Sequence, residues 1–261
     1  MRWLNLVFVL LVNAVPLYGI KYLGWSIGTV LMLYWVENLL VALFTCGRIA
    51  LHRALTRKSG HWRGGSLGVM VNGKPSTSGL LGEYATMAIV FTLAHGIFVF
   101  AIVFLFGEGR ADPEQWRFSA EQFRFGALQM IGLMSADFLV DAVQMRSRSF
   151  AWIKTYVQQR MGRVLVLHLA IIFGMMAMAA TESPIAVLYV LIGLKTLWDL
   201  AAAGSSAKAD SLPENAPQWL GKFADKVADK HGGAAAMQAD WKRARENLLR
   251  AAREDEQVRP A

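Results

Sequence analysis

The chain has 261 residues, of which 55% are hydrophobic, and its mean hydropathy is +0.35. Positive hydropathy with long apolar runs excludes an ordinary soluble domain and predicts a polytopic membrane protein. The formal net charge is +8. In a membrane protein we interpret this charge as basic loops that face anionic lipid headgroups, so we expect no nucleic-acid partner. The single cysteine, Cys46, excludes an intramolecular disulfide.

Six segments are long and apolar enough to cross a bilayer, which takes about 20 residues. They cover residues 3–22, 25–47, 84–106, 122–145, 163–181 and 184–203. We interpret the first as a retained membrane helix, and the very short turn at Leu23 and Gly24 predicts that the first two helices pair as a hairpin. The predicted fold is therefore all-α, with a six-helix transmembrane domain at 1–204 and a tail at 205–261.

Basic residues gather in two of the predicted loops. The first holds Arg48, Arg53, Arg57, Lys58, Arg63 and Lys74, and the second holds Arg146, Arg148, Lys154 and Arg160. The loops on the opposite side are poorer in basic residues: one holds Glu108, Arg110, Asp112, Glu114 and Arg117, and the other holds only Glu182. Because basic loops stay in the cytoplasm, the pattern predicts that both termini are cytoplasmic.

The first basic loop contains a glycine-rich run from Gly68 to Lys74 that looks like the start of a phosphate-binding loop. Pro75 stands where such a loop needs Ser or Thr, so we interpret the run as a flexible loop. His52, His61 and His231 fall in predicted loops and tail, where we expect them to be solvated.

The polar tail contains two amphipathic patterns. Residues 219–230 predict a short helix whose lysine stripe beside an aromatic face suits anionic lipid headgroups. Residues 234–253 predict a second helix, which would pack on the first or on a protein partner. We expect residues 254–261 to be disordered.

Ionisable residues recur within the predicted spans, where facing lipid would cost several kcal/mol. They are Glu37, His95, Asp137, Asp141, His168, Lys195 and Asp199. At about 1.5 Å per residue, Asp141, His168 and Asp199 fall at one depth, and the other four lie deeper. This coincidence predicts a site shared by five helices.

Three hypotheses account for these residues. In the first, His95, His168, Asp137 and Glu37 bind a divalent metal such as zinc, and Glu37 and Asp137 are catalytic residues for hydrolysis of a lipid-like substrate. The residues that would orient or pair with this set are Asp141, Lys195, Asp199 and Asn38. In the second, Glu37 and Asp137 carry protons in a proton- or ion-coupled transporter. In the third, the residues form a structural network that fixes helix packing. Two histidines and four carboxylates against one deep lysine favour a functional site, since a structural network should be closer to neutral.

Four motifs add a resemblance. They are Tyr34-Trp35-x-Glu37-Asn38, His95-Gly96-x-Phe98, Arg163-x-x-x-Leu167-His168 and Lys195-x-x-x-Asp199. Together they resemble an uncharacterised bacterial integral-membrane family, a domain of unknown function with a Tyr-Trp-x-Glu-Asn signature. The resemblance ends at about Gly204 and implies a six-helix protein of the bacterial inner membrane with no established activity. Ala88 and Ala202 stand where it leads us to expect two further histidines.

Overall fold

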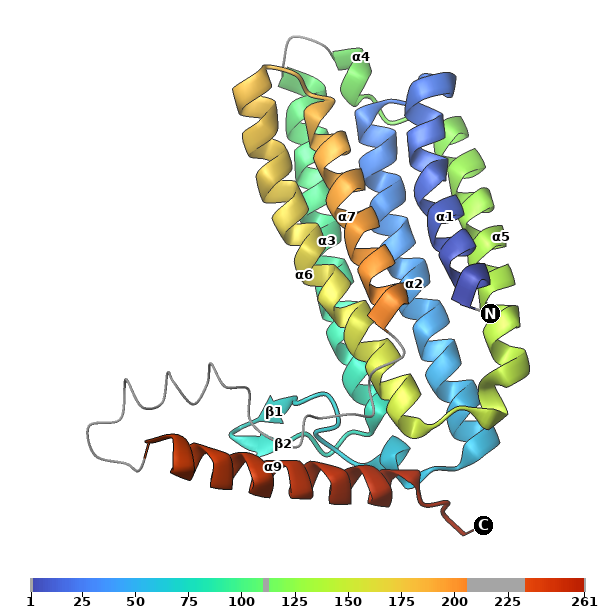
Figure 1. The fold of residues 1–261 in the computed structure, drawn as a ribbon. Coiled ribbons are helices and arrows are strands. Elements are labelled where there is room, and N and C mark those ends of the chain that lie inside the picture. Colours follow the sequence, from blue (N-terminus) through green and yellow to red (C-terminus); the bar gives the residue numbers. More distant parts are fainter. Residues whose placement is uncertain (1, 110–112, 206–232, 261) are drawn as a thin grey trace.

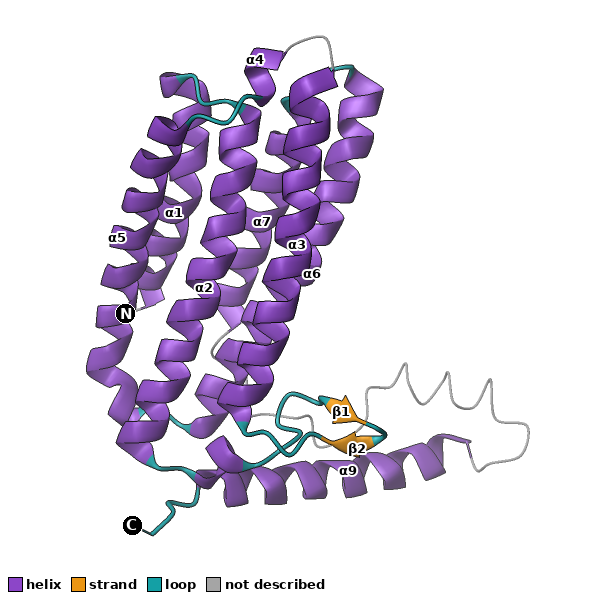
Figure 2. Cartoon of the chain, turned by 180° about the vertical axis from the view of Figure 1, so that it is seen from behind, coloured by secondary structure: helices purple, strands orange, loops and turns teal. Residues whose placement is uncertain are grey.

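The computed structural model describes residues 2–109, 113–205 and 233–260, and Figure 1 shows a helical bundle with one helix crossing its end. The long helices of the bundle are α1 (Arg2–Leu23), α2 (Ile27–Thr56), α3 (Leu80–Gly109), α5 (Ala120–Gln144), α6 (Phe150–Thr181) and α7 (Ala186–Ser205). Short elements connect them: η1 (Ser59–Trp62), β1 (Met70–Val71), β2 (Lys74–Pro75), α4 (Pro113–Trp116) and η2 (Met145–Ser147). The crossing helix is α9 (Gly233–Glu256), and Figure 2 shows it beneath the bundle from the other side.

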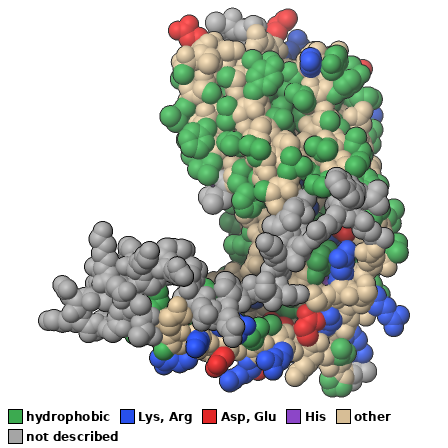
Figure 3. Space-filling view, in the orientation of Figure 1, with side chains coloured by type: hydrophobic (Ala, Val, Ile, Leu, Met, Phe, Trp, Pro, Cys, Tyr) green, Lys and Arg blue, Asp and Glu red, His purple; other side chains and the backbone are tan. Residues whose placement is uncertain are grey.

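The outside of the bundle is apolar, as a helical membrane protein requires. By length and composition, five segments of the described chain can cross a membrane: Leu6–Leu23, Ile27–Thr56, Leu80–Phe104, Glu114–Ser147 and Phe150–Thr181. α7, which carries Lys195 and Asp199, packs against α1 and α6 in the same bundle. Figure 3 shows hydrophobic side chains covering one face of the bundle, with charged side chains gathered toward its two ends.

α2 forms the centre of the bundle and is longer than the sequence predicts. Ser26 caps its start, because the Ser26 Oγ accepts a hydrogen bond from the Thr29 backbone N–H at 3.2 Å. The helix ends at Arg57, whose φ of +52° is left-handed. α2 therefore continues nine residues past the predicted end at 47, and it carries Arg48 and His52 into the bundle rather than into a loop.

The predicted pairing of the first two helices differs from the structure. α1 is joined to α2 by a short turn, in which the Trp25 N–H bonds the Gly19 carbonyl at 2.9 Å. α1 nevertheless packs mainly against α5 and α7, with few contacts to α2. Asn13 explains part of this packing, since its side chain forms hydrogen bonds with Lys195 and Asp199 on α7.

The loop before α3 is ordered by a hairpin and by one buried carboxylate. β1 and β2 pair in antiparallel fashion, and Asn72 and Gly73 take the left-handed φ values of +52° and +74° that a tight hairpin turn uses. The predicted flexible loop is therefore a short hairpin. Glu83, in the first turn of α3, is buried and accepts the backbone N–H groups of Gly65 and Leu67. These bonds tie the loop to α3.

The predicted helix at 234–253 is confirmed as α9, but the predicted disorder after it is wrong. Glu254 pairs with Arg63 on the loop after η1. Glu256 pairs with Lys58 at 2.6 Å and accepts the N–H of Ala151 in the first turn of α6. A charged acceptor at a helix start is stabilising, so the end of the chain is held against the bundle. The predicted helix at 219–230 lies outside the described residues.

His52 and His61 are buried, contrary to the prediction that they are solvated. His52 Nε2 lies 3.2 Å from the Arg148 carbonyl, which only accepts, so His52 Nε2 carries the proton. His52 Nδ1 then accepts a 2.6 Å hydrogen bond from His61 Nε2. Burial, with His52, Arg53 and Lys58 nearby, lowers the pKa of His61 to about 3. The two rings link α2 and η1 to the segment before α6.

Candidate functional site

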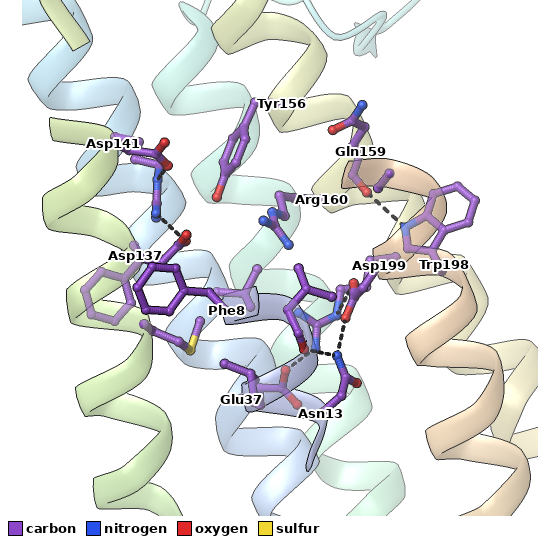
Figure 4. Close-up of a pocket in the computed structure, with 18 of the residues that line it drawn as sticks. Phe8, Asn13, Glu37, Asp137, Asp141, Tyr156, Gln159, Arg160, Trp198 and Asp199 are labelled. Atoms are coloured by element: carbon purple, nitrogen blue, oxygen red, sulfur yellow. Dashed lines mark hydrogen bonds and ion pairs between the residues drawn. The ribbon is translucent and has the colours of Figure 1, made fainter. Parts of the chain in front are cut away.

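A cavity of about 530 Å³ lies between α1, α2, α5, α6 and α7 (Figure 4), and its lining residues fall in the half of the bundle nearer α9. In Figure 1, α1 begins and α7 ends part-way along the bundle, whereas α2, α5 and α6 continue toward α9. The side chains on its wall fall into two classes. Its apolar and aromatic residues include Phe8, Val9, Val12, Val41, Phe44, Met134, Trp152, Tyr156 and Trp198. Its charged residues are Glu37, Arg48, Asp137, Asp141, Arg148, Arg160, Arg163 and Asp199.

The outer charged group joins α2 to α5, and we call it the outer cluster (Arg48, Asp137, Asp141). Arg48 Nη2 lies 2.7 Å from Asp137 Oδ2, and Arg48 Nε lies 2.8 Å from Asp141 Oδ2. Asp137 and Asp141 are one helical turn apart, so one guanidinium reaches both. Arg48 is 2% exposed, whereas Asp137 is 22% exposed. The outer cluster thus buries its cation and leaves Asp137 in part accessible.

The inner charged group joins four helices, and we call it the inner cluster (Asn13, Glu37, Arg163, Lys195, Asp199). Glu37 Oε1 lies 2.6 Å from Arg163 Nη2 and 3.0 Å from Lys195 Nζ. Lys195 Nζ also lies 3.5 Å from Asp199 Oδ2 and donates to Asn13 Oδ1 at 2.5 Å. Asn13 Nδ2 completes the ring by donating to Asp199 at 3.3 Å. Buried carboxylates and cations thus neutralise one another.

One oxygen of the inner cluster remains without a hydrogen bond. Glu37 is 1% exposed, and its Oε2 finds no donor within the described part of the chain. Lys195 is fully buried and bridges Glu37 and Asp199. The inner cluster therefore contains a buried carboxylate with spare acceptor capacity beside a buried ammonium group.

The two histidines of the predicted metal site lie elsewhere. His95 on α3 and His168 on α6 have ring centroids 5.5 Å apart, and Phe91 contacts both rings. Neither histidine lines the cavity. Across the described ranges, no group of three or more His, Cys, Asp or Glu side chains is arranged to hold a metal ion.

The structure thus does not assemble the four predicted ligands. The physical reason is that Glu37 and Asp137 are turned toward Arg163 and Arg48, whereas the histidines lie between α3 and α6. Counting residues put these four side chains at two adjacent depths, but depth does not fix which face of a helix they occupy.

Asn38 also lies away from the charged clusters. It lines a separate cavity of about 90 Å³, and its buried Nδ2 finds no acceptor among the described residues. The neighbouring motif residue Trp35 donates from Nε1 to the Thr92 carbonyl at 2.9 Å. This contact needs Gly96, because a Cβ there would collide with the indole of Trp35. Trp35 of the signature therefore docks α2 onto α3.

Four arginines of the cavity were not among the predicted site residues: Arg48, Arg148, Arg160 and Arg163. Three were assigned to basic loops. Arg48 and Arg160 lie in α2 and α6, which extend well beyond the apolar runs that predicted them, and Arg148 lies two residues before α6. The sequence argument that four carboxylates faced one lysine is therefore wrong. With every group ionised, Lys195 and these four arginines slightly exceed the carboxylates, so the charge imbalance that favoured a metal ion disappears.

Known proteins give a family but no activity. Neither the curated proteins nor the solved structures contain a match to the chain. A family model, described as a family of unknown function, matches residues 1–216, a range that spans α1 to α7 and both charged clusters. This agrees with the resemblance carried by the motifs at Glu37, His95, His168 and Lys195. The chain belongs to the family of unknown function DUF6498.

Proposed function

We propose that the protein is a proton-coupled transport protein of the bacterial inner membrane, with six membrane-spanning helices (α1, α2, α3, α5, α6 and α7). The observation that carries the proposal is the 530 Å³ cavity, which reaches from the partly exposed Asp137 to the buried Glu37. Ionisable groups in a membrane interior that face a cavity are typical of proton and solute pathways.

The end of the bundle near α9 is then cytoplasmic. Arg48 and Arg160 no longer count as loop residues, but the basic excess at this end remains. It rests on Arg53, Arg57, Lys58, Arg63, Lys74, Arg146, Arg148 and Lys154. The positive-inside rule places such an end in the cytoplasm. α9 crosses this end (Figure 1), and its exposed basic residues, Lys242, Arg243, Arg250 and Arg253, suit anionic lipid headgroups.

The two clusters supply the steps of a proton route. Asp137 faces the cavity and exchanges protons with its contents, since it remains 22% exposed. Glu37 offers an unbonded Oε2 to a proton, and Lys195 is positioned to shift between Glu37 and Asp199 as their charges change. Protonation of Glu37 would weaken its ion pairs with Arg163 and Lys195, which hold α2 to α6 and α7. Proton binding is thereby coupled to helix packing.

Hydrolysis fits this arrangement less well than transport. A general base must be within reach of a proton on a water or substrate. Glu37 Oε1 and Asp137 Oδ2 each bond an arginine instead. The arginines that line the cavity suit a site that binds and releases a charged group.

The test is proton flux in proteoliposomes. Purified protein is reconstituted with a pH-sensitive dye inside, and a potassium gradient with valinomycin drives protons inward. We expect Glu37→Gln to reduce the flux at least tenfold, because the amide cannot be protonated at Oε2. Glu182→Gln is the matched control, since Glu182 is exposed at the far end of α6 and should leave the flux unchanged. Wild-type flux no greater than that of empty liposomes, or equal flux in Glu37→Gln, would refute the proposal.

A further inference from the structure

The wall of the cavity formed by α6 is a ladder of cations and aromatic rings. Trp152, Tyr156 and Arg160 follow one another at four-residue spacing, which places them on one face of α6, and Arg148 lies in extended backbone two residues before the helix. The Arg148 guanidinium lies 4.8 Å from the Trp152 ring centroid, and the Arg160 guanidinium lies 4.8 Å from the Tyr156 ring centroid. The Trp152 and Tyr156 rings stack with centroids 5.6 Å apart. We call these four residues the α6 ladder.

The carboxylates of the cavity are already bound by other cations. Arg48 holds Asp137 and Asp141, while Arg163 and Lys195 hold Glu37 and Asp199. In the described part of the chain no ion pair within 4.0 Å reaches either arginine of the α6 ladder. Figure 4 shows Arg160 in the cavity between Asp137 and Asp199, with no dashed line to either.

The charged residues that line the cavity, counted together with Lys195, which pairs with Glu37, comprise five cations and four carboxylates when every group is ionised. A surplus positive charge in a cavity of low dielectric constant is costly unless an anion or water accompanies it. We assign the surplus to the α6 ladder, since its two arginines are the cations of the cavity with no carboxylate within 4.0 Å among the described residues. Cation–aromatic contacts hold both guanidinium groups in place without neutralising them.

The rest of the wall indicates what kind of anion fits. Phe8, Val9, Val12 and Phe44 line the side contributed by α1 and α2, and Trp198 on α7 donates from Nε1 to the Gln159 carbonyl at 3.3 Å (Figure 4). A volume of about 530 Å³ is within the range of small-molecule sites. An inorganic ion would leave these apolar side chains uncovered. An anion with an apolar body would bury them.

We propose that the cavity binds an organic anion, a carboxylate or phosphate group on an apolar body, with Arg160 contacting the anionic group. Arg148 lies nearer the α9 end and attracts the anion toward the cavity, and Trp152 and Tyr156 flank its path. This inference rests on the proposed transport function, because the bound anion is the solute that the cavity would carry. Its source is either an anionic lipid or a soluble organic anion, and both share this chemistry.

The test uses hexyl phosphate as the probe and isothermal titration calorimetry as the measurement. Full-length protein in phosphatidylcholine nanodiscs is titrated, and the signal of empty nanodiscs is subtracted. We expect Arg160→Gln to weaken binding at least tenfold and Arg160→Lys to weaken it by no more than a few fold. Arg146→Gln is the matched control, because Arg146 is an exposed arginine in η2 and should leave binding unchanged. Thermal unfolding of each variant shows that it is folded.

A second arm distinguishes the sources. The same titration is repeated in nanodiscs that contain phosphatidylglycerol. If hexyl phosphate no longer binds there, the occupant is a lipid headgroup; if its binding is unchanged, the occupant is a soluble anion. Equal affinity in Arg160→Gln and wild type, or no binding of hexyl phosphate in either lipid, would overturn the proposal. Proton flux reports separately on the transport function. Loss of flux in Glu37→Gln with unchanged hexyl phosphate binding in Arg160→Gln would reject only the anion site.

Discussion

Replacing Arg48 with methionine should destabilise the bundle strongly. The substitution removes the cation of the outer cluster and leaves Asp137 and Asp141, one helical turn apart, without their 2.7 Å and 2.8 Å ion pairs. Breaking a buried ion pair by removing one partner costs about 3–5 kcal/mol. Asp137 is 22% exposed to the cavity, which offsets part of the loss. We therefore expect a decrease of about 3 kcal/mol in the free energy of unfolding, at the low end of that range.

The reasoning also predicts a rescue. The triple variant Arg48→Met, Asp137→Asn, Asp141→Asn removes the uncompensated charges, so most of the lost stability should return. The measurement is reversible unfolding in detergent micelles by titration with sodium dodecyl sulfate, followed by circular dichroism. Arg146→Met, on the exposed surface of η2, is the control and should change stability by less than about 0.5 kcal/mol. A triple variant no more stable than Arg48→Met would show that lost packing, and not unpaired charge, is the cause.

Three further outcomes are expected. Glu83→Ala should speed hydrogen exchange of the Gly65 and Leu67 amides at least tenfold, because each loses its acceptor; unchanged exchange would contradict the role of this carboxylate. Wild-type protein should lose stability as the pH falls below about 6.5, since unfolded His61 then binds a proton that folded His61, with a pKa of about 3, does not. His61 contributes at most about 1.4 kcal/mol per pH unit to the dependence of the unfolding free energy on pH. His61→Phe should therefore flatten the dependence of thermal unfolding on pH; parallel profiles for wild type and variant would exclude His61 as its origin. Glu256→Gln should cost about 1 kcal/mol and increase proteolysis of α9, because it removes the ion pair with Lys58 and the negative charge at the start of α6; resistance equal to wild type would show that α9 is held by other contacts.

The apolar runs predicted the helices of the bundle but not their ends. The predicted second span stops at 47, yet α2 continues to Thr56. Gly47 lies within the continuous helix, and its bare Cα packs toward Phe138 on α5. The predicted fifth span begins at 163, yet α6 begins at Phe150, where the Ser149 Oγ accepts from the Trp152 N–H. Hydropathy marks where a helix meets lipid, and a helix that leaves lipid does not stop there.

The candidate site was predicted only in part, because the sequence gives the depth of a residue along its helix but not the direction of its side chain. Lys195 and Asp199, at one-turn spacing on the same face, do meet, and Glu37 joins them. His95 does not join this group, although its depth is similar, because it lies on the face of α3 that meets His168 on α6. Depth follows from counting residues, at about 1.5 Å each. The direction of a side chain follows from helix rotation, which depends on contacts that one sequence does not reveal.

The arginines show what would sharpen such a prediction. Arg48 lies one residue beyond its predicted span and Asp141 four residues inside the end of its own, so their backbones differ in depth by about 8 Å. A long arginine side chain spans much of that difference, and it can extend either toward water or into the bundle. Water offers hydration, whereas the bundle offers two carboxylates that would otherwise be buried without a cation. The carboxylates that would otherwise lack a cation therefore determine that the arginine side chain extends into the bundle. A basic residue within a turn or two of a span end belongs to the buried network when a neighbouring helix has an uncompensated acid within its reach.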